Sequence, residues 1–189
     1  SRERAKENVS RILEDAKNLF TKFETRSELL GAWNLEKERK DGYHGRELLE
    51  LLQNVDDAYE ELCQNKEAEK GKEVVAEIKF LNGIFSISNT GTYFTDTSIQ
   101  RLCQGGVSTK KEYYIGNKGT GFRSLLNWGK KIRVYSGDYS IQFSEEYAQK
   151  QLQEIQNSEI VKKQLNEKPE INFPILFAPE WLEENRNQY

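Results

Sequence analysis

Methionine is absent from this chain, even at position 1, and histidine occurs only once, as His44. A chain without an initiator methionine is expected to be a processed or trimmed piece of a longer protein. There are only two cysteines, Cys63 and Cys103, which is too few for a disulfide framework or a cysteine-based metal site. This low cysteine count fits a reducing compartment, so we expect a cytoplasmic protein.

Long apolar runs and an excess of basic residues are also missing. No apolar stretch approaches the length that would span a membrane, and the N-terminus is charged rather than signal-like. The 28 Lys and Arg residues are outnumbered by 31 Asp and Glu, for a net charge of −3. We therefore expect no membrane partner and no bulk binding of nucleic acid by this segment itself.

The aromatic residues, 9 Tyr, 9 Phe and 3 Trp in 189 residues, can build the core of one sizeable domain. Apolar periodicity predicts helices over 1–23 and 27–38, and a peripheral helical insertion near 145–168. Alternation predicts one hairpin of strands 74–80 and 84–88 and a second hairpin of strands 131–135 and 139–144. Residues 171–177, which lie between prolines, are predicted to form a short edge strand or an extended segment. The expected fold class is α+β.

A polar stripe marks the predicted helix that begins near Arg46. At about 100° per residue, Glu50, Asn54 and Asp57 fall on one face together with Glu47. The apolar residues of the opposite face, which should hold the helix against a core, are Leu48, Leu51, Leu52, Val55 and Tyr59. A carboxylate base, an amide oxygen and a second carboxylate at this spacing suit Mg²⁺, water and a polar ligand edge.

Two glycine-containing segments follow the helix. Asn89-Thr90-Gly91 forms a tight turn at the end of a strand, and residues 115–124 carry three glycines close together. Glycines let backbone N–H groups approach a phosphate without interference from a Cβ. Between the two segments, Lys110 lies in a polar stretch that can reach anionic oxygens. We interpret His44 as an ordinary residue at a loop–helix junction.

Taken in order, these three segments resemble the GHKL superfamily, which includes gyrase, heat-shock-protein-90-like chaperones, histidine kinases and MutL. Glu50-x-x-x-Asn54-x-x-Asp57-Ala58 is similar to its N-box, Asn89-Thr90-Gly91 to its first glycine box, and residues 115–124 to its second. Further short motifs, such as Ser108-Thr109-Lys110, resemble those of the sacsin-like branch of this superfamily. The similarity covers residues 42–143.

The resemblance implies a Bergerat fold, an α/β sandwich in which helices cover one face of a mixed, mainly antiparallel sheet and a lid closes over ATP. Glu50 would be the general base, and Asn54 the Mg²⁺ ligand. The implied nucleotide-binding residues are Asn54, Asp57, Asn89, Gly91, Tyr93, Lys110, Gly116, Lys118, Gly119, Thr120, Gly121 and Phe122. ATP and Mg²⁺ are thus the expected cofactors.

Two residues depart from the family pattern. Asn89 stands where the family has an adenine-reading Asp, and Tyr93 where it has a second glycine. An amide oxygen can still accept a hydrogen bond from the adenine amino group, but without the charge. We therefore expect weaker or altered base selectivity, with Tyr93 lining the base pocket.

Two functions follow from the resemblance. The first is an ATP-hydrolysing module, with N-terminal helices over 1–40 and an ATP-binding domain over 41–189. Its lid closure or dimerisation would drive downstream domains of a larger chaperone-like, nucleic-acid-handling or phage-defence protein. The alternative is a nucleotide-gated interaction module that binds ATP with little or no hydrolysis. Expected partners are ATP and ADP, the downstream domains, and a second copy in an ATP-dependent homodimer.

Overall fold

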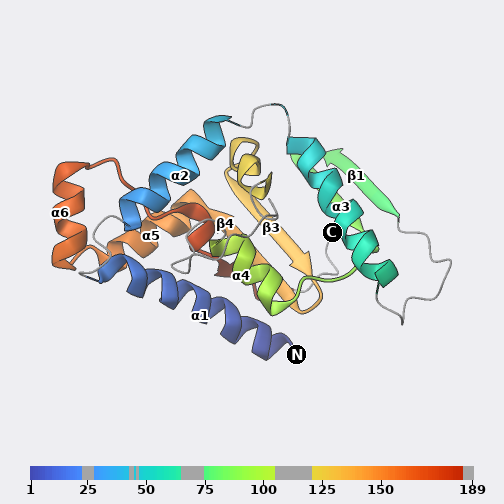
Figure 1. The fold of residues 1–189 in the computed structure, drawn as a ribbon, viewed down its shortest axis with the longest axis horizontal. Coiled ribbons are helices and arrows are strands. Elements are labelled where there is room, and N and C mark those ends of the chain that lie inside the picture. The colour runs from blue at the N-terminus through green and yellow to red at the C-terminus, as the bar shows by residue number, and fades with distance from the viewer. Residues whose placement is uncertain (23–27, 43–44, 46, 65–74, 105–120, 185–189) are drawn as a thin grey trace. The chain divides into compact units, whose positions relative to one another are not determined.

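The computed structural model describes residues 1–22, 28–42, 45, 47–64, 75–104 and 121–184. The chain divides into two compact units (Figure 1). Residues 45–93 form the smaller unit, and residues 1–44 together with 94–189 form the larger one. Helices and small antiparallel sheets occur together, so the predicted α+β class is confirmed.

The smaller unit consists of one helix and one hairpin. Helix α3 spans Glu47–Gln64, and strands β1 (Ala76–Leu81) and β2 (Ile84–Asn89) pair antiparallel. The turn between the strands is Asn82-Gly83, with φ of 52° and 75°. Two successive positive φ angles match the type I′ turn that this dipeptide favours, so the hairpin was predictable from its sequence.

Helices and a three-stranded sheet build the larger unit. Its helices are α1 (Arg2–Thr21), α2 (Glu28–Gly42), α4 (Asp96–Gln104), α5 (Glu145–Ile155) and α6 (Glu159–Glu167), with 3₁₀ helices η2 (Gly121–Asn127) and η3 (Ile175–Phe177). Its strands β3 (Lys131–Ser136), β4 (Tyr139–Ser144) and β5 (Glu180–Trp181) lie in the order β3-β4-β5, and both pairings are antiparallel. The predicted second hairpin is therefore confirmed.

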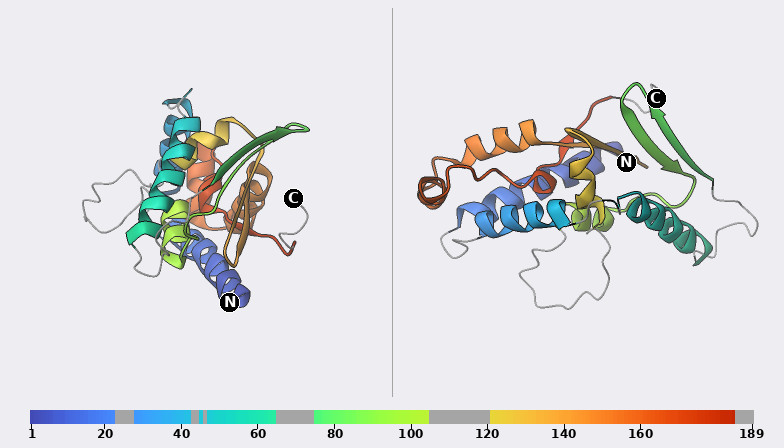
Figure 2. Two further views of the ribbon diagram at one scale, coloured as in Figure 1. Left: turned by 90° about the vertical axis from the view of Figure 1, so that its right-hand side faces the viewer. Right: turned by 90° about the horizontal axis from the view of Figure 1, so that it is seen from above.

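The core of the larger unit lies among α1, α2, α5 and α6, and Figure 2 shows α1, α2 and α5 running side by side. Phe20 is fully buried, with its ring 5.1 Å from that of Phe173 and 5.5 Å from that of Phe177. Residues 145–168 are helical as predicted, but the expected peripheral position is wrong. Leu152 and Val161 are buried in this core because one face of each helix is apolar.

Of the two conformations predicted for 171–177, an edge strand or an extended segment, the edge strand is wrong. The segment is buried and turns through η3 instead of pairing in a sheet. The buried carboxylate of Glu36 accepts hydrogen bonds from the backbone N–H groups of Ile175, at 2.7 Å, and Leu176, at 3.0 Å. These donors are thus satisfied by a side chain from α2 rather than by a neighbouring strand.

A hydrogen-bonded network fixes the start of α4, the helix that follows the first glycine box. The hydroxyl of buried Tyr139 donates to Asp96 Oδ1 at 2.6 Å and accepts from Asn8 Nδ2 at 2.9 Å. Arg4 pairs with the other oxygen of Asp96 at 2.8 Å. At the helix N-terminus, Thr95 Oγ1 accepts from the backbone N–H of Ser98 at 3.2 Å and so caps α4.

We expect Tyr139→Phe to lower the free energy of unfolding by about 1–3 kcal/mol at neutral pH, because it leaves the buried Asn8 amide without its acceptor. Urea denaturation measures this loss. Tyr147→Phe is the matched control and should change stability by less than about 0.5 kcal/mol. If Tyr139→Phe and Tyr147→Phe lower the free energy of unfolding equally, the hydrogen bonds of Tyr139 do not stabilise the fold.

The same network predicts an alkaline pH dependence. Burial, and then the hydrogen bond to Asp96, raises the pKa of Tyr139 to about 12. In the unfolded chain the phenol ionises at about pH 10. Above that pH the unfolded state loses its proton first, so the stabilisation is complete below about pH 10 and declines as the pH rises towards 12. The stability gap between wild type and Tyr139→Phe should therefore narrow by about 1 kcal/mol at pH 11.

Candidate functional site

Six of the predicted site residues lie in the smaller unit. Glu50, Asn54 and Asp57 project from α3, and Asn89, Gly91 and Tyr93 lie at or just beyond the end of β2. Glu50 and Asp57 are half-buried, whereas Asn54 is exposed. The first glycine box and the polar helix stripe thus belong to one compact unit.

The helix begins with a buried carboxylate. Glu47 is only 3% exposed, and its Oε2 accepts a hydrogen bond from the backbone N–H of Gly45 at 2.8 Å. Gly45 has φ of +87°, a conformation that favours glycine. Glu47 therefore fixes the first turn of α3. It lies on the same polar stripe as Glu50, the predicted general base, which follows one turn later.

Gly91 packs directly against α3. A Cβ at this position would come within 2.8 Å of the Ala58 Cβ and 3.1 Å of its backbone carbon. The backbone N–H of Thr92 also donates to the Ala58 carbonyl oxygen at 3.4 Å. Only a residue without a side chain lets the glycine box lie this close to the helix.

This contact lies on the predicted polar face. Ala58 follows Asn54 by four residues and Glu50 by eight, so all three share one side of the helix. At 1.5 Å per residue, Asn54 lies about 6 Å along the axis from Ala58, and Glu50 about 12 Å. Starting at Gly91, the order along the face is therefore Ala58, Asn54 and Glu50.

A side-chain hydrogen bond makes a further connection between the box and the helix. Thr92 Oγ1 donates to Glu61 Oε2 at 3.1 Å. Sequence reasoning missed both residues. Glu61 lies four residues beyond Asp57, so an extension of the polar stripe by one turn would have included Glu61. Nothing in the sequence indicates that Glu61 pairs with Thr92.

The side chain of Asn89 shapes the turn. Its Oδ1 accepts the backbone N–H of Gly91 at 2.8 Å. On the other side of the turn, Thr90 and Val75 exchange two hydrogen bonds, which continue the hairpin by one residue pair. Because an amide oxygen has two lone pairs, Asn89 keeps one acceptor position for a ligand. Tyr93 is 69% exposed beside this turn.

The remaining predicted residues divide into two sets. Gly121 and Phe122 begin η2 of the larger unit, which is a 3₁₀ helix of seven residues. The Phe122 side chain is buried, with its ring centroid 6.0 Å from that of Phe143, so it anchors η2 in the core. Five predicted residues lie outside the described part: Lys110, Gly116, Lys118, Gly119 and Thr120.

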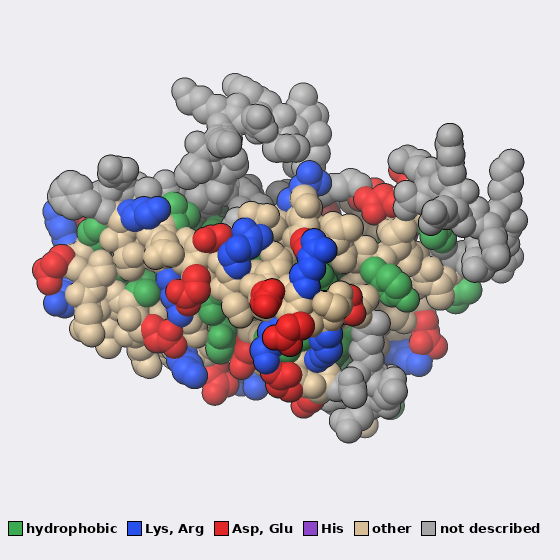
Figure 3. All heavy atoms as spheres, turned by 90° about the horizontal axis from the view of Figure 1, so that it is seen from below, with side chains coloured by type: hydrophobic (Ala, Val, Ile, Leu, Met, Phe, Trp, Pro, Cys, Tyr) green, Lys and Arg blue, Asp and Glu red, His purple; other side chains and the backbone are tan. Residues whose placement is uncertain are grey.

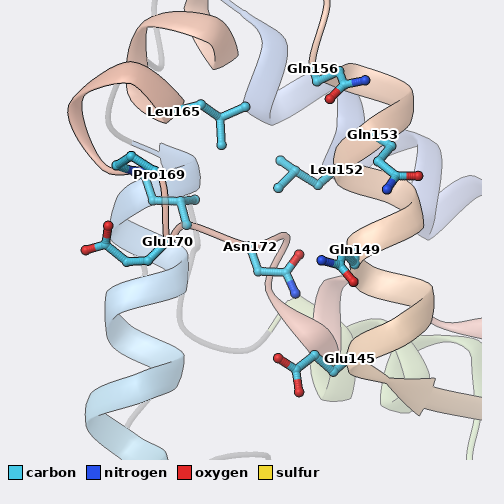
Figure 4. A pocket seen from close by; sticks show the side chains of 10 residues that line it. Glu145, Gln149, Leu152, Gln153, Gln156, Leu165, Pro169, Glu170 and Asn172 are labelled. Carbon is cyan, nitrogen blue, oxygen red and sulfur yellow. The ribbon is translucent and has the colours of Figure 1, made fainter.

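A cavity of about 370 Å³ lies elsewhere, in the larger unit, between α5 and the segment that follows α6 (Figure 4). It contains none of the predicted site residues. Its lining includes Glu145, Gln149, Leu152, Leu165, Glu170 and Asn172. With carboxylates and amides but no Lys or Arg in its lining, this cavity has no positive charge to hold a phosphate.

The charge of the described surface is mixed. On the face drawn in Figure 3, Lys and Arg side chains alternate with Asp and Glu. Among the described residues, no three His, Cys, Asp or Glu side chains gather into a metal-binding group. The described helices also include none that is long and apolar enough to cross a membrane.

Comparison with known proteins gives one partial similarity. Over 98 residues the chain is 33% identical to Protein NO VEIN of Arabidopsis thaliana. The match covers 51% of this chain but only 3% of the NO VEIN chain, so the present chain spans a small part of that relative's length. No family model and no solved structure matches the chain.

Proposed function

We propose that this chain is an Mg-ATP-binding and ATP-hydrolysing module of the GHKL type, located in the cytoplasm. The observation that carries the proposal is the packing of Gly91 against Ala58, on the helix face that also bears Asn54 and Glu50. This contact brings the first glycine box to one end of the polar stripe. A ligand that touches the box can then extend along the stripe.

The order of residues along that face agrees with the roles that the resemblance implies. The adenine end of the nucleotide would lie by Asn89, Gly91 and Asp57. Asn54, about one turn away, would contribute an oxygen to Mg²⁺, with phosphate oxygens completing the coordination shell. Glu50, another turn on, would accept a proton from the attacking water.

The resemblance also implies phosphate donors in the glycine-rich segment 115–124 and at Lys110. Mg²⁺ would offset charge on the phosphate oxygens. Hydrolysis by this chain would drive downstream domains of a larger protein. A chaperone-like protein and one that handles nucleic acid or defends against phage are both compatible with such a module.

The first test is calorimetric titration of the chain with ATP, with and without Mg²⁺. We expect wild type to bind ATP in an Mg²⁺-dependent manner, and Asn54→Ala to lose that dependence, with affinity at least tenfold lower because one oxygen ligand is gone.

The matched control is Gln53→Ala, which truncates an exposed amide next to Asn54 in sequence but about 100° away from it around the helix. This variant should bind ATP like wild type. A folded wild-type chain that binds no ATP would contradict the proposed function, and equal affinities of wild type and Asn54→Ala would contradict the assigned metal ligand.

A further inference from the structure

Strand β1 has an open edge in the part of the chain that the structure describes. It pairs with β2 and with no other described strand, and every one of its residues is exposed. Alternation of apolar and polar residues over 74–80 predicts a strand with one buried face, but every residue of β1 is exposed, so that prediction is wrong. An exposed strand edge presents unpaired N–H and C=O groups to another strand.

The register of the hairpin shows which backbone groups face that edge. Thr90 N–H donates to the Val75 carbonyl oxygen at 3.2 Å, so this pair is hydrogen-bonded. In an antiparallel ladder, hydrogen-bonded pairs recur at every second residue. The residues of β1 whose N–H and C=O groups point to the open edge are therefore Ala76, Ile78 and Phe80.

We propose that β1 pairs antiparallel with β1 of a second copy of this chain, about a two-fold axis at Ile78. In this register Ile78 lies opposite its own counterpart, and Ala76 lies opposite Phe80. The outward-pointing N–H and C=O groups of Ala76, Ile78 and Phe80 then face those of the second copy. Three facing pairs that exchange two hydrogen bonds each give about six hydrogen bonds between the copies. The contact is isologous, so it closes as a dimer rather than growing into a filament.

Charge complementarity supports a second copy of this chain as the partner of β1. In the proposed register, Glu77 of each copy lies opposite Lys79 of the other, in a non-hydrogen-bonded pair whose side chains are close. Within one chain, Lys79 Nζ already lies 2.8 Å from Glu77 Oε2, on the same face of the strand. The four charges of a dimer would thus alternate in sign.

The same charges disfavour the other registers. A shift of two residues keeps the backbone groups aligned but places Glu77 opposite Glu77, or Lys79 opposite Lys79. Like charges directly opposite each other are destabilising. A shift of one residue sets outward-pointing groups against inward-pointing ones and loses the hydrogen bonds. Of these registers, only the one centred on Ile78 satisfies both requirements.

Apolar side chains on β1 gain partners in this dimer. Phe80 is 75% exposed and Ile78 47% exposed, and both belong to a face that continues across the hairpin to Phe85 and Ile87. Joining two hairpins produces a four-stranded sheet with a continuous apolar face. On the other face, Val75 comes opposite Leu81, two side chains that are also more than half exposed.

The oligomeric state of the chain without nucleotide tests the proposal, by sedimentation velocity over a range of concentrations. Wild type should form dimers, and the single reversals Glu77→Lys and Lys79→Glu should each weaken the dimer roughly tenfold or more. The double variant, which restores opposite charges across the axis, should recover it. As a matched control, Lys162→Glu reverses the charge of an exposed side chain on α6, the same change as Lys79→Glu, and should leave the dimer intact.

A cysteine placed on the axis tests the register independently. Facing residues of a hydrogen-bonded antiparallel pair have Cα atoms about 5.5 Å apart, within the range of a disulfide. Ile78→Cys, made with Cys63→Ser, should therefore form a disulfide-linked dimer on oxidation, whereas Lys79→Cys should cross-link far less. A monomeric wild type, a dimer insensitive to both charge reversals, or stronger cross-linking at position 79 would overturn the proposal.

Discussion

Glu50→Ala is expected to slow single-turnover ATP hydrolysis by about 10²- to 10⁴-fold, the usual contribution of a general base. Glu50 is half-buried on the face of α3 that bears Asn54 and meets Gly91. Removing its carboxylate leaves the attacking water without a proton acceptor, while the groups proposed to bind the nucleotide remain. ATP affinity should therefore change much less than the hydrolysis rate.

The matched control is Glu60→Ala, which removes an exposed carboxylate from the same helix, about 80° around the helix from Glu50 and about 120° from Asn54. This variant should hydrolyse ATP like wild type. If wild type and Glu50→Ala instead hydrolyse ATP equally slowly while wild type still binds it, the chain is a nucleotide-gated interaction module. That result would reject the enzymatic part of the proposal and keep its binding part.

Gly91→Ala is expected to have the second large effect, weakening ATP binding at least tenfold and lowering the free energy of unfolding by about 1–3 kcal/mol. The new methyl group would lie 2.8 Å from the Ala58 Cβ and 3.1 Å from its backbone carbon. A backbone atom in a helix cannot move aside as the end of a flexible side chain can. The glycine box must therefore shift away from the polar face. Urea denaturation and calorimetric titration measure the two losses.

Gly31→Ala provides the control for this substitution. A Cβ at Gly31, the fourth residue of α2, would meet nothing within 4 Å. Replacing an unhindered helical glycine with alanine should stabilise the chain by about 0.5–1 kcal/mol and leave ATP binding unchanged. Unaltered stability and binding in Gly91→Ala would show that the close approach to Ala58 is not required.

Local structure was largely predictable because it depends on neighbouring residues. Asn82-Gly83 favours a type I′ turn, and that turn sets the register of β1 and β2. Thr95 caps α4 through a hydrogen bond to a residue three positions later. Conformational preferences of this kind act over a few residues, so they can be read without knowledge of the rest of the fold.

Burial was less predictable, since it depends on distant partners. Residues 145–168 are rich in Gln and Glu, yet their apolar faces pack with Phe20 and Leu29 of the N-terminal helices. In α3, Leu48 and Leu52 were expected to face a core, but both are more than a third exposed. Periodicity shows that a helix has an apolar face and does not show what, if anything, covers it.

The sequence by itself determined the helix that carries Glu50, Asn54 and Asp57, since its periodicity alone puts these residues on one face. Tertiary structure alone decided that the first glycine box contacts that face, through Gly91 and Ala58. It also decided that Thr92 bonds to Glu61, 31 residues earlier in the chain. The physical reason is that a face is a local property of helix geometry, whereas a contact depends on how the whole chain folds back on itself.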